Sequence, residues 1–184
     1  RNPIDRAFSG YQHVKRYNSD ENLNFEDALE ISEQRYFTNN NITPASRYIH
    51  IGMYNEFVRK FKTKFKTNVH IIIYKDFINN TNQELSRLFS FLGIKDIQID
   101  FNKQYMVGGW KWKNDLFRKI FMKRHFLKKF IPFKRLIKAV FKSFATDSVE
   151  KIDDTIREKL IGIYKDDIKN LSTFLNVDLN FWTK

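Results

Sequence analysis

The chain has 184 residues, of which 42% are apolar and 16% aromatic, and this composition favours a folded domain over a disordered chain. It contains no cysteine, which excludes disulfides and thiolate metal sites from these residues and favours a reducing compartment, the cytoplasm. The formal net charge is +12, and charged residues interrupt every apolar run before the roughly 18 residues of a membrane span. A membrane-associated or Golgi-type location stays open if an anchor precedes the chain.

The first predicted element is a helix from Pro3 to about Tyr17. Asn2 can cap its start, and Pro3 suits its first turn because proline needs no hydrogen-bond partner there. Asp5 favours the positive end of the helix dipole. The sequence therefore predicts an ordered helix whose start is free to face an anion.

Helical spacing continues after a polar, turn-like stretch at residues 18–24. Apolar and charged residues alternate with helical period from Phe25 to Tyr36, and an Asn-rich loop follows from Thr38 to Ser46. The next predicted helix runs from Ile51 to Phe65.

The one strong strand pattern is Val69–Tyr74, a β-branched and almost entirely apolar run that suits a strand buried on both faces of a parallel sheet. His70 lies inside this run and is interpreted as structural. A central strand needs neighbours on both sides, and the sequence does not visibly supply them. We therefore expect the partner strands to come from a preceding segment, in agreement with the missing initial methionine.

Helices dominate the remainder of the predicted fold. Thr81 is expected to cap a helix that runs through Leu92, with Gly93 as its left-handed stop. A loop is expected from Phe101 to Gly109, and a last helix from about Ser148 to Leu175.

Positive charge is concentrated in one segment. The formal charge is +3 in residues 1–110, +11 in 111–142 and −2 in 143–184. Residues 115–145 read as a basic amphipathic helical segment, interrupted at Pro132. This segment is either a lysine-rich solvent face, an electropositive rim that attracts an acidic glycan or a membrane-held acceptor, or a nucleic-acid- or anionic-membrane-binding surface of a protein without catalysis.

The opening residues, Arg-Asn-Pro-Ile-Asp-Arg-Ala-Phe-Ser-Gly-Tyr, indicate an anion site. A helix start offers free backbone N–H groups and partial positive charge, and Arg1 adds a fork-shaped donor just before it. Ser9 lies on the following turns, where its hydroxyl can reach a phosphate oxygen held by Arg1. His13 follows Ser9 by four residues and therefore shares its helix face.

This motif resembles the 3′-phosphate motif of the sulfotransferases that use 3′-phosphoadenosine 5′-phosphosulfate (PAPS). Further elements resemble the family's in the same order: Gly52-Met-Tyr54 with its helix, Val-His-Ile-Ile-Ile-Tyr-Lys-Asp-Phe, Phe91-Leu-Gly, and the tail Ile-Tyr-Lys-Asp-Asp-Ile-Lys-Asn-Leu. The resemblance implies a P-loop-NTPase-like α/β fold, with a parallel sheet flanked by helices. Residues 1–184 would be a mostly helical C-terminal portion of one sulfotransferase domain, with one strong strand.

The resemblance also implies roles for individual residues. Arg1 and Ser9 would bind the 3′-phosphate. The Tyr-Gln-His sequence after Ser9 is similar to the heparan-sulfate N-sulfotransferase branch, which implies a catalytic role for His13; a surface histidine on an amphipathic helix is the alternative. Val107–Lys113 lies where the family's late nucleotide-binding loop is expected, which implies nucleotide contacts from Gly109, Lys111 and Lys113, although the family's common Lys-Gly form is absent.

By this resemblance the protein transfers a sulfonate group from PAPS to a hydroxyl or amine, and the Tyr-Gln-His match favours a carbohydrate acceptor. The family's 5′-phosphosulfate loop, with Gly, Thr and Lys, does not occur in residues 1–184, so this portion by itself is expected to be inactive. The four histidines show no metal-ligand spacing, and we expect no metal site. The expected partners are a nucleotide donor, a glycan or other acceptor and an anionic membrane surface, not nucleic acid.

Overall fold

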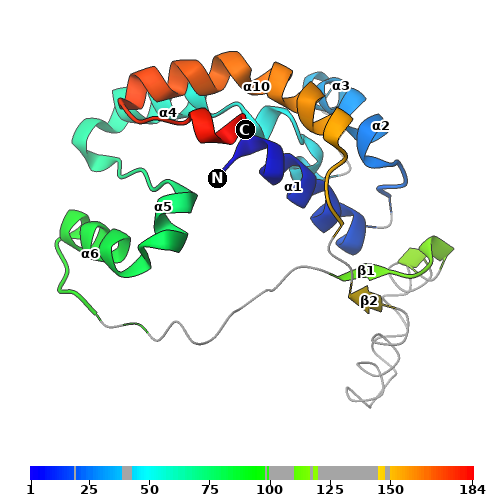
Figure 1. The fold of residues 1–184 in the computed structure, drawn as a ribbon, viewed down its shortest axis with the longest axis horizontal. Helices are drawn as coiled ribbons and strands as arrows, with labels where there is room; N and C mark the ends of the chain where they lie inside the picture. Colours follow the sequence, from blue (N-terminus) through cyan, green and yellow to red (C-terminus); the bar gives the residue numbers. More distant parts are fainter. Residues whose placement is uncertain are drawn as a thin grey trace. The chain divides into compact units, whose positions relative to one another are not determined.

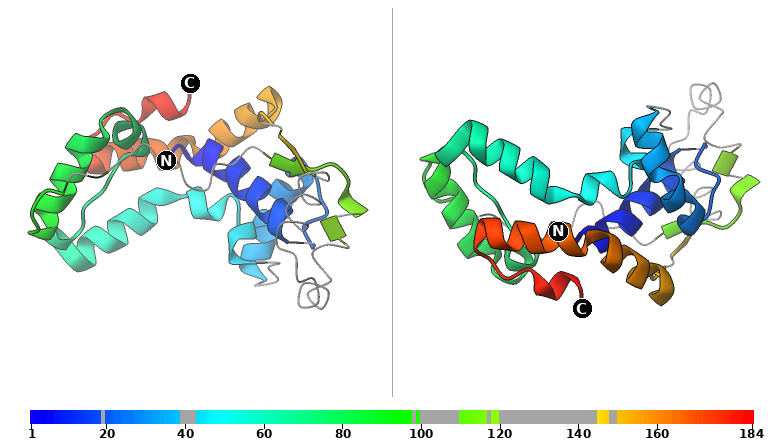
Figure 2. Two further views of the ribbon diagram at one scale, coloured as in Figure 1. Left: turned by 90° about the horizontal axis from the view of Figure 1, so that it is seen from below. Right: turned by 90° about the horizontal axis from the view of Figure 1, so that it is seen from above.

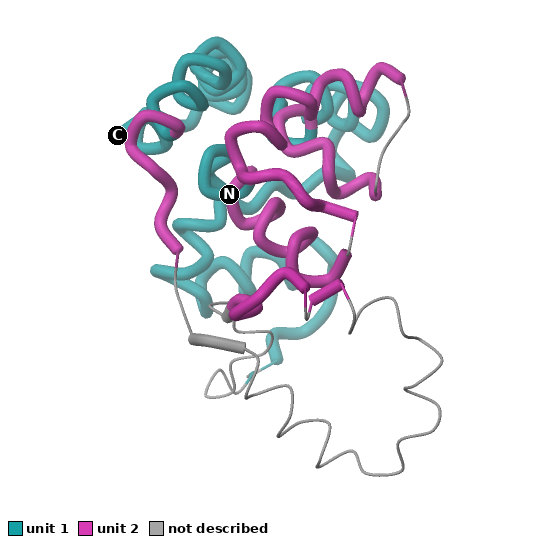
Figure 3. The backbone as a smooth tube through the Cα atoms, turned by 90° about the vertical axis from the view of Figure 1, so that its right-hand side faces the viewer, with its two compact units in different colours: residues 1–6, 51–105, 157–184 teal, residues 7–50, 106–156 magenta. Residues whose placement is uncertain are grey.

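The computed structural model describes residues 1–18, 20–38, 43–97, 99, 110–116, 118–119, 145–147 and 150–184. The chain divides into two compact units, coloured teal and magenta in Figure 3. Unit 1 comprises residues 1–6, 51–105 and 157–184, and unit 2 comprises residues 7–50 and 106–156. The basic segment predicted at 115–145 lies almost entirely outside the described residues.

Helix α1 (Pro3–Tyr17) has the predicted bounds (Figure 1). The side-chain oxygen of Asn2 accepts a 2.9 Å hydrogen bond from the Ile4 N–H, so Asn2 caps the helix as predicted. The buried residues recur at the spacing of an amphipathic helix: Ile4, Ala7, Tyr11 and Val14. The remaining faces of α1 are therefore available for polar contacts.

Unit 1 is built from helices and short 3-10 turns. After the turn η2 (His50–Gly52), its elements are α4 (Tyr54–Phe65), η3 (Lys66–Asn68), α5 (Tyr74–Asn79), α6 (Thr81–Leu92), α10 (Asp154–Leu175) and η4 (Asn180–Trp182). The buried side chains of α10 and the C-terminus form the centre of its core: Leu160, Tyr164, Ile168, Leu171, Leu179 and Trp182. The apolar face of α10 thus organises this unit.

Helix α4 begins at a carboxylate supplied by α10. The backbone N–H groups of Tyr54 and Asn55 donate to Asp167, with distances of 2.9 Å from Tyr54 and 3.2 Å from Asn55. Burial raises the pKa of Asp167, against the opposing effect of these two hydrogen bonds. Further along both helices, the Arg59 guanidinium lies 4.3 Å from the centre of the Phe174 ring. Because the start of α4 meets Asp167 and a later residue of α4 meets a later residue of α10, the two helices run in the same direction, as Figure 2 shows.

Gly52 allows a close approach between η2 and α10. A Cβ at this position would lie 2.6 Å from the hydroxyl oxygen of Tyr164 and 2.8 Å from two of its ring carbons. Tyr164 is fully buried and has little room to move. Only glycine therefore fits here without displacing the aromatic ring.

The strand predicted at Val69–Tyr74 is not present. Val69 and Ile73 have extended backbone angles, but residues 69–73 pair with no strand among the described residues, and Tyr74 already begins α5. The side chains at 69–73 are half-buried rather than buried. The apolar pattern gives an extended backbone, whereas a ladder also needs a neighbouring strand to accept and donate its hydrogen bonds.

Helix α6 has the predicted bounds and the predicted stop. Gly93 adopts φ +68°, in the left-handed region that glycine enters without a steric penalty. The predicted cap is wrong, because Asn80 precedes the helix and Thr81 is its first residue. The Thr81 hydroxyl donates instead to the Phe77 carbonyl, 2.7 Å away, and so closes the end of α5.

Unit 2 contains α2 (Phe25–Glu30) and α3 (Ser32–Phe37), where the sequence predicts continuous helical spacing. The two helices meet at Ile31 and pack over a buried charged cluster. The Arg35 guanidinium donates to Glu21 at 2.7 and 3.3 Å, and the Tyr48 hydroxyl donates to Glu21 at 2.7 Å. Burial, and then the hydrogen bond to Glu21, raise the pKa of Tyr48.

A two-stranded antiparallel ribbon joins distant parts of unit 2. Strand β1 (Trp110–Trp112) pairs with β2 (Ala145–Asp147), with Lys111 opposite Thr146. This ribbon was not predicted, and no parallel sheet occurs within the described ranges. Helix α10 starts at Asp154, later than the predicted Ser148, because Asp153 accepts a hydrogen bond from the Thr155 N–H and acts as its cap.

Candidate functional site

One stripe of α1 carries the polar side chains singled out by the sequence. Ser9 is half-buried and His13 is exposed, one turn further along. Gln12 and Arg16 follow Ser9 by three and seven residues, and this spacing places all four side chains along the same side of the helix. The ring of His13 lies 4.8 Å from that of Tyr17. The stripe lies on the side of α1 away from its buried face.

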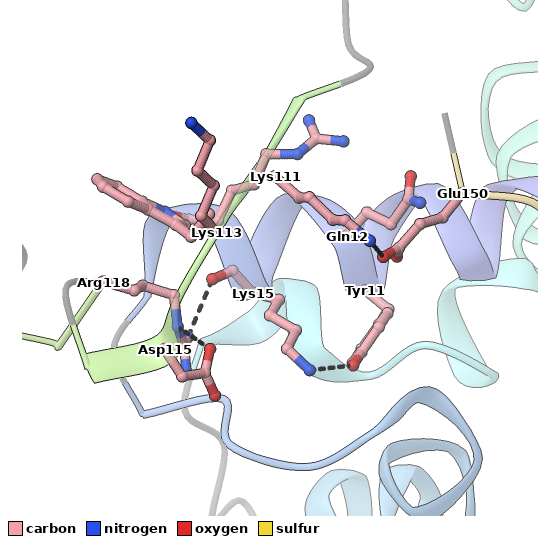
Figure 4. Close-up of a pocket in the computed structure, with 10 residues that line it drawn as sticks. Tyr11, Gln12, Lys15, Lys111, Lys113, Asp115, Arg118 and Glu150 are labelled. Carbon is pink, nitrogen blue, oxygen red and sulfur yellow. Dashed lines mark hydrogen bonds and ion pairs between the residues drawn. The ribbon is translucent and has the colours of Figure 1, made fainter. Parts of the chain in front are cut away.

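The end of this stripe opens into a pocket of about 340 Å³ within unit 2 (Figure 4). Its walls come from the second half of α1, from β1 and the residues after it, and from the segment before α10. Five cationic side chains line it, Lys15, Arg16, Lys111, Lys113 and Arg118, with Tyr11, Gln12, Trp112, Asp115 and Glu150. With only two carboxylates among these residues, the pocket carries an excess of positive charge.

Arg118 holds the last turn of α1 in place. Its guanidinium is 1% exposed and donates to the Lys15 carbonyl at 2.9 Å and to the Asn18 carbonyl at 2.7 Å. The Trp112 indole N–H donates to the Arg16 carbonyl at 3.0 Å. The last carbonyls of a helix lack intrahelical partners and carry partial negative charge, so these donors are well matched to them. The pocket wall is therefore pre-organised.

Tyr11 and Lys15 form a second fixed part of the wall. The Lys15 ammonium donates to the Tyr11 hydroxyl at 2.8 Å and to the Leu23 carbonyl at 3.2 Å, and the Tyr11 hydroxyl donates to the same carbonyl at 2.9 Å. Burial, followed by the charge of Glu21, raises the pKa of Tyr11. Tyr11 therefore stays protonated near neutral pH and is a hydrogen-bond donor rather than a base.

The two carboxylates of the pocket are more accessible. Lys111 lies 2.7 Å from Glu150, and these side chains are 48% and 43% exposed. Arg118 lies 3.0 Å from Asp115, whose side chain is 53% exposed. Each carboxylate keeps acceptor capacity beyond its one cation, because an ionised carboxylate has two oxygens.

The structure brings together some of the residues that the sequence indicated. Lys111 and Lys113 line the pocket together, whereas Ser9 and His13 lie on α1 outside its lining. Arg1 belongs to unit 1, where its guanidinium lies 5.6 Å from the centre of the Tyr74 ring. Gly109 lies outside the described residues.

The sequence prediction missed most of the pocket. The missed residues are Tyr11, Gln12, Lys15, Arg16, Asp115, Arg118 and Glu150. One signal was available, because Lys15 and Arg16 are basic residues in the last turn of a well-predicted helix. Their meeting with Arg118 and Glu150 had no signal, since more than a hundred residues separate Lys15 from Arg118.

Neither a metal cluster nor a membrane span occurs within the described parts of the chain. No group of three or more His, Cys, Asp or Glu side chains there is placed to hold a metal ion. No helix in those ranges is both long and apolar enough to span a membrane.

Comparison with known proteins identifies the family. The sulfotransferase domain family matches residues 1–163, which include all of α1 and the pocket. No curated protein matches the sequence. The crystal structure of a sulfotransferase from Alicyclobacillus acidocaldarius is similar in fold, with a TM-score of 0.65 and 21% identity; the match covers 100% of this chain and 55% of that one. With most of its length matched, the chain belongs to the sulfotransferase domain family.

Proposed function

We propose that the protein takes part in the transfer of a sulfonate group from PAPS to a hydroxyl or amine, with a carbohydrate as acceptor. The observation that carries the proposal is the family match over residues 1–163, which starts at the Arg-Asn-Pro motif. The helix that this motif predicts is present, with its Asn2 cap. The likeness in fold to a bacterial sulfotransferase supports the same proposal, including the P-loop-like parallel sheet expected for the complete domain.

In this proposal the donor nucleotide binds at the start and middle of α1. Arg1 and Ser9 hold the 3′-phosphate, which anchors the donor away from the bond that breaks. Gly109, Lys111 and Lys113 form the late nucleotide-binding loop. Lys111 and Lys113 support this role by lining a cationic pocket beside α1.

The reaction is an in-line displacement at sulfur. The acceptor oxygen or nitrogen forms a bond to sulfur, the bond from sulfur to the bridging oxygen of the 5′-phosphate breaks, and adenosine 3′,5′-bisphosphate leaves. His13 is exposed and one turn from Ser9. From there it either donates a hydrogen bond to the leaving oxygen or accepts the acceptor's proton. Cationic donors stabilise the charge that builds on the leaving group.

Residues 1–184 are proposed to bind the nucleotide product without catalysing transfer. They contain no Gly/Thr/Lys loop for the 5′-phosphosulfate, and they match 55% of the bacterial sulfotransferase chain. We expect calorimetry to detect adenosine 3′,5′-bisphosphate binding, and a radiolabelled-PAPS assay to detect no product. Robust transfer by these residues alone would contradict this part of the proposal.

The nucleotide site itself is tested by Ser9→Ala. A hydrogen bond to a charged group contributes about 1.5–3 kcal/mol, so calorimetry should show bisphosphate affinity reduced about tenfold or more. Arg1→Ala should weaken binding at least as much, because it removes a full charge. Ser90→Ala, on the exposed side of α6, is the matched control and should bind normally. Unchanged affinity in Ser9→Ala and Arg1→Ala would refute the 3′-phosphate site.

A further inference from the structure

The cationic pocket of unit 2 extends beyond the residues assigned to the nucleotide. Arg118, Trp112 and Lys15 fix its inner wall through backbone carbonyls. Arg16 is a further cation of the lining and has no role in the proposed nucleotide site. The pocket therefore combines a rigid base with an excess of positive charge, an arrangement that favours an anionic ligand.

Through Gln12 and Arg16 the pocket also reaches the helix side that carries the proposed nucleotide site. Arg16 follows Ser9 by seven residues, which is two turns and about 10 Å along the helix axis. His13 lies between them on this stripe. A molecule held near Arg16 can thus extend along α1 toward His13 and Ser9.

The remaining lining suits a sugar ring. Trp112 is half-buried, and its indole is fixed by the hydrogen bond to the Arg16 carbonyl, so it offers a positioned aromatic surface. Asp115 and Glu150 are exposed and can accept hydrogen bonds from hydroxyl groups. Cations, an aromatic ring and carboxylates together match an acidic sugar better than a purely apolar or purely anionic ligand.

We propose that this pocket is a subsite for an acidic sugar unit of the acceptor. Arg16 binds its carboxylate or sulfate, the Trp112 ring contacts one face of the sugar, and Glu150 and Asp115 accept hydrogen bonds from its hydroxyls. This inference rests on the proposed function and specifies the acceptor as a negatively charged carbohydrate. The subsite positions the acceptor along α1 and takes no part in the chemical step.

The test is a calorimetric titration with a monosulfated disaccharide that contains a uronic acid, alongside lactose as a neutral disaccharide and sodium sulfate as a simple anion. We expect the acidic disaccharide to bind, lactose not to bind detectably, and sulfate to bind at least tenfold more weakly. Arg16→Gln should weaken the acidic disaccharide about five- to tenfold.

Lys165→Gln is the charge-matched control, because it removes a positive charge from an exposed position on α10. It should bind the acidic disaccharide as the unchanged protein does. No binding of the acidic disaccharide, equal binding of sodium sulfate, or equal weakening by Lys165→Gln would each overturn the subsite. The last result would mean that net charge alone attracts the sugar.

The nucleotide titration separates this inference from the proposed function. Arg16→Gln should leave the affinity for adenosine 3′,5′-bisphosphate unchanged, whereas Ser9→Ala should lower it and leave the disaccharide unaffected. If Arg16→Gln weakens the nucleotide, or the nucleotide displaces the disaccharide competitively, the pocket belongs to the donor and the subsite is refuted. If Ser9→Ala alone fails to act, the nucleotide assignment is wrong but the sugar-binding result still stands.

Discussion

Two groups of charged side chains in unit 2 differ in burial and in the balance between positive and negative charges. In the Glu21 cluster, the side chains of Glu21 and Arg35 are 0% and 9% exposed, and Tyr48 supplies a further hydrogen bond. In the pocket beside α1, cations outnumber carboxylates, and the rim pair of Lys111 and Glu150 is about half exposed.

This difference separates charge that maintains the fold from charge available to a ligand. A buried pair must be matched, because an uncompensated charge in the interior costs several kcal/mol. An exposed cation is hydrated and costs little, so an excess can persist at a surface pocket. The Glu21 cluster is therefore expected to control stability, and the pocket rim to control binding.

The largest effect is expected for Glu21→Gln. This change keeps the shape of the side chain but leaves the Arg35 guanidinium buried without its anion, and it should lower the free energy of unfolding by about 3–5 kcal/mol. Urea unfolding followed by circular dichroism measures it. Glu26→Gln, on the exposed side of α2, is the control and should change stability by less than about 1 kcal/mol. Similar losses in both variants would show that the Glu21 cluster is not a stabilising centre.

An intermediate effect on stability is expected for Arg118→Met. Arg118 is buried, like the charges of the Glu21 cluster, but it also lines the pocket. Methionine fills the space but donates no hydrogen bond to the Lys15 and Asn18 carbonyls, so stability should fall by about 2–3 kcal/mol. The last turn of α1 should then exchange its amide hydrogens faster. Lys119→Met is the control for replacing a cation by methionine at a neighbouring position, and it should leave amide exchange in α1 unchanged. Unchanged exchange in α1 would mean that Arg118 does not hold that turn.

The smallest effect on stability is expected for Lys111→Gln. Its ion pair with Glu150 is exposed, and such pairs contribute about 0–1 kcal/mol. Thermal unfolding should therefore shift by no more than a few degrees, while calorimetry should show weaker binding of adenosine 3′,5′-bisphosphate, since Lys111 belongs to the proposed nucleotide loop. A loss of stability as large as that of Glu21→Gln would mean that Lys111 stabilises the fold, and would contradict its assignment to binding.

Local patterns in the sequence predicted the bounds of two helices. The bounds of α1 and α6 follow from their apolar spacing, from the Asn2 cap and from the Gly93 stop. These signals act within a few residues, because each helical hydrogen bond joins positions four apart. The start of α10 was missed because the cap, Asp153, lies five residues beyond the predicted start at Ser148.

Pairing between distant segments was not predictable in the same way. Val69–Ile73 has the composition of a strand, but composition does not supply a neighbour for its ladder. The β1–β2 ribbon is the reverse case, since its two segments are short, are separated by more than thirty residues and carry no strong alternation.

The sequence by itself determined the family and the α1 motif, because Arg1 just before the helix and Ser9 and His13 within it are related by local spacing. Only the tertiary structure decided which cations meet. Lys15 and Arg16 join Lys111, Lys113 and Arg118 in one pocket because side chains from β1 and the residues after it bind the last carbonyls of α1. Such contacts depend on the folded path of the chain between them, which no local pattern encodes.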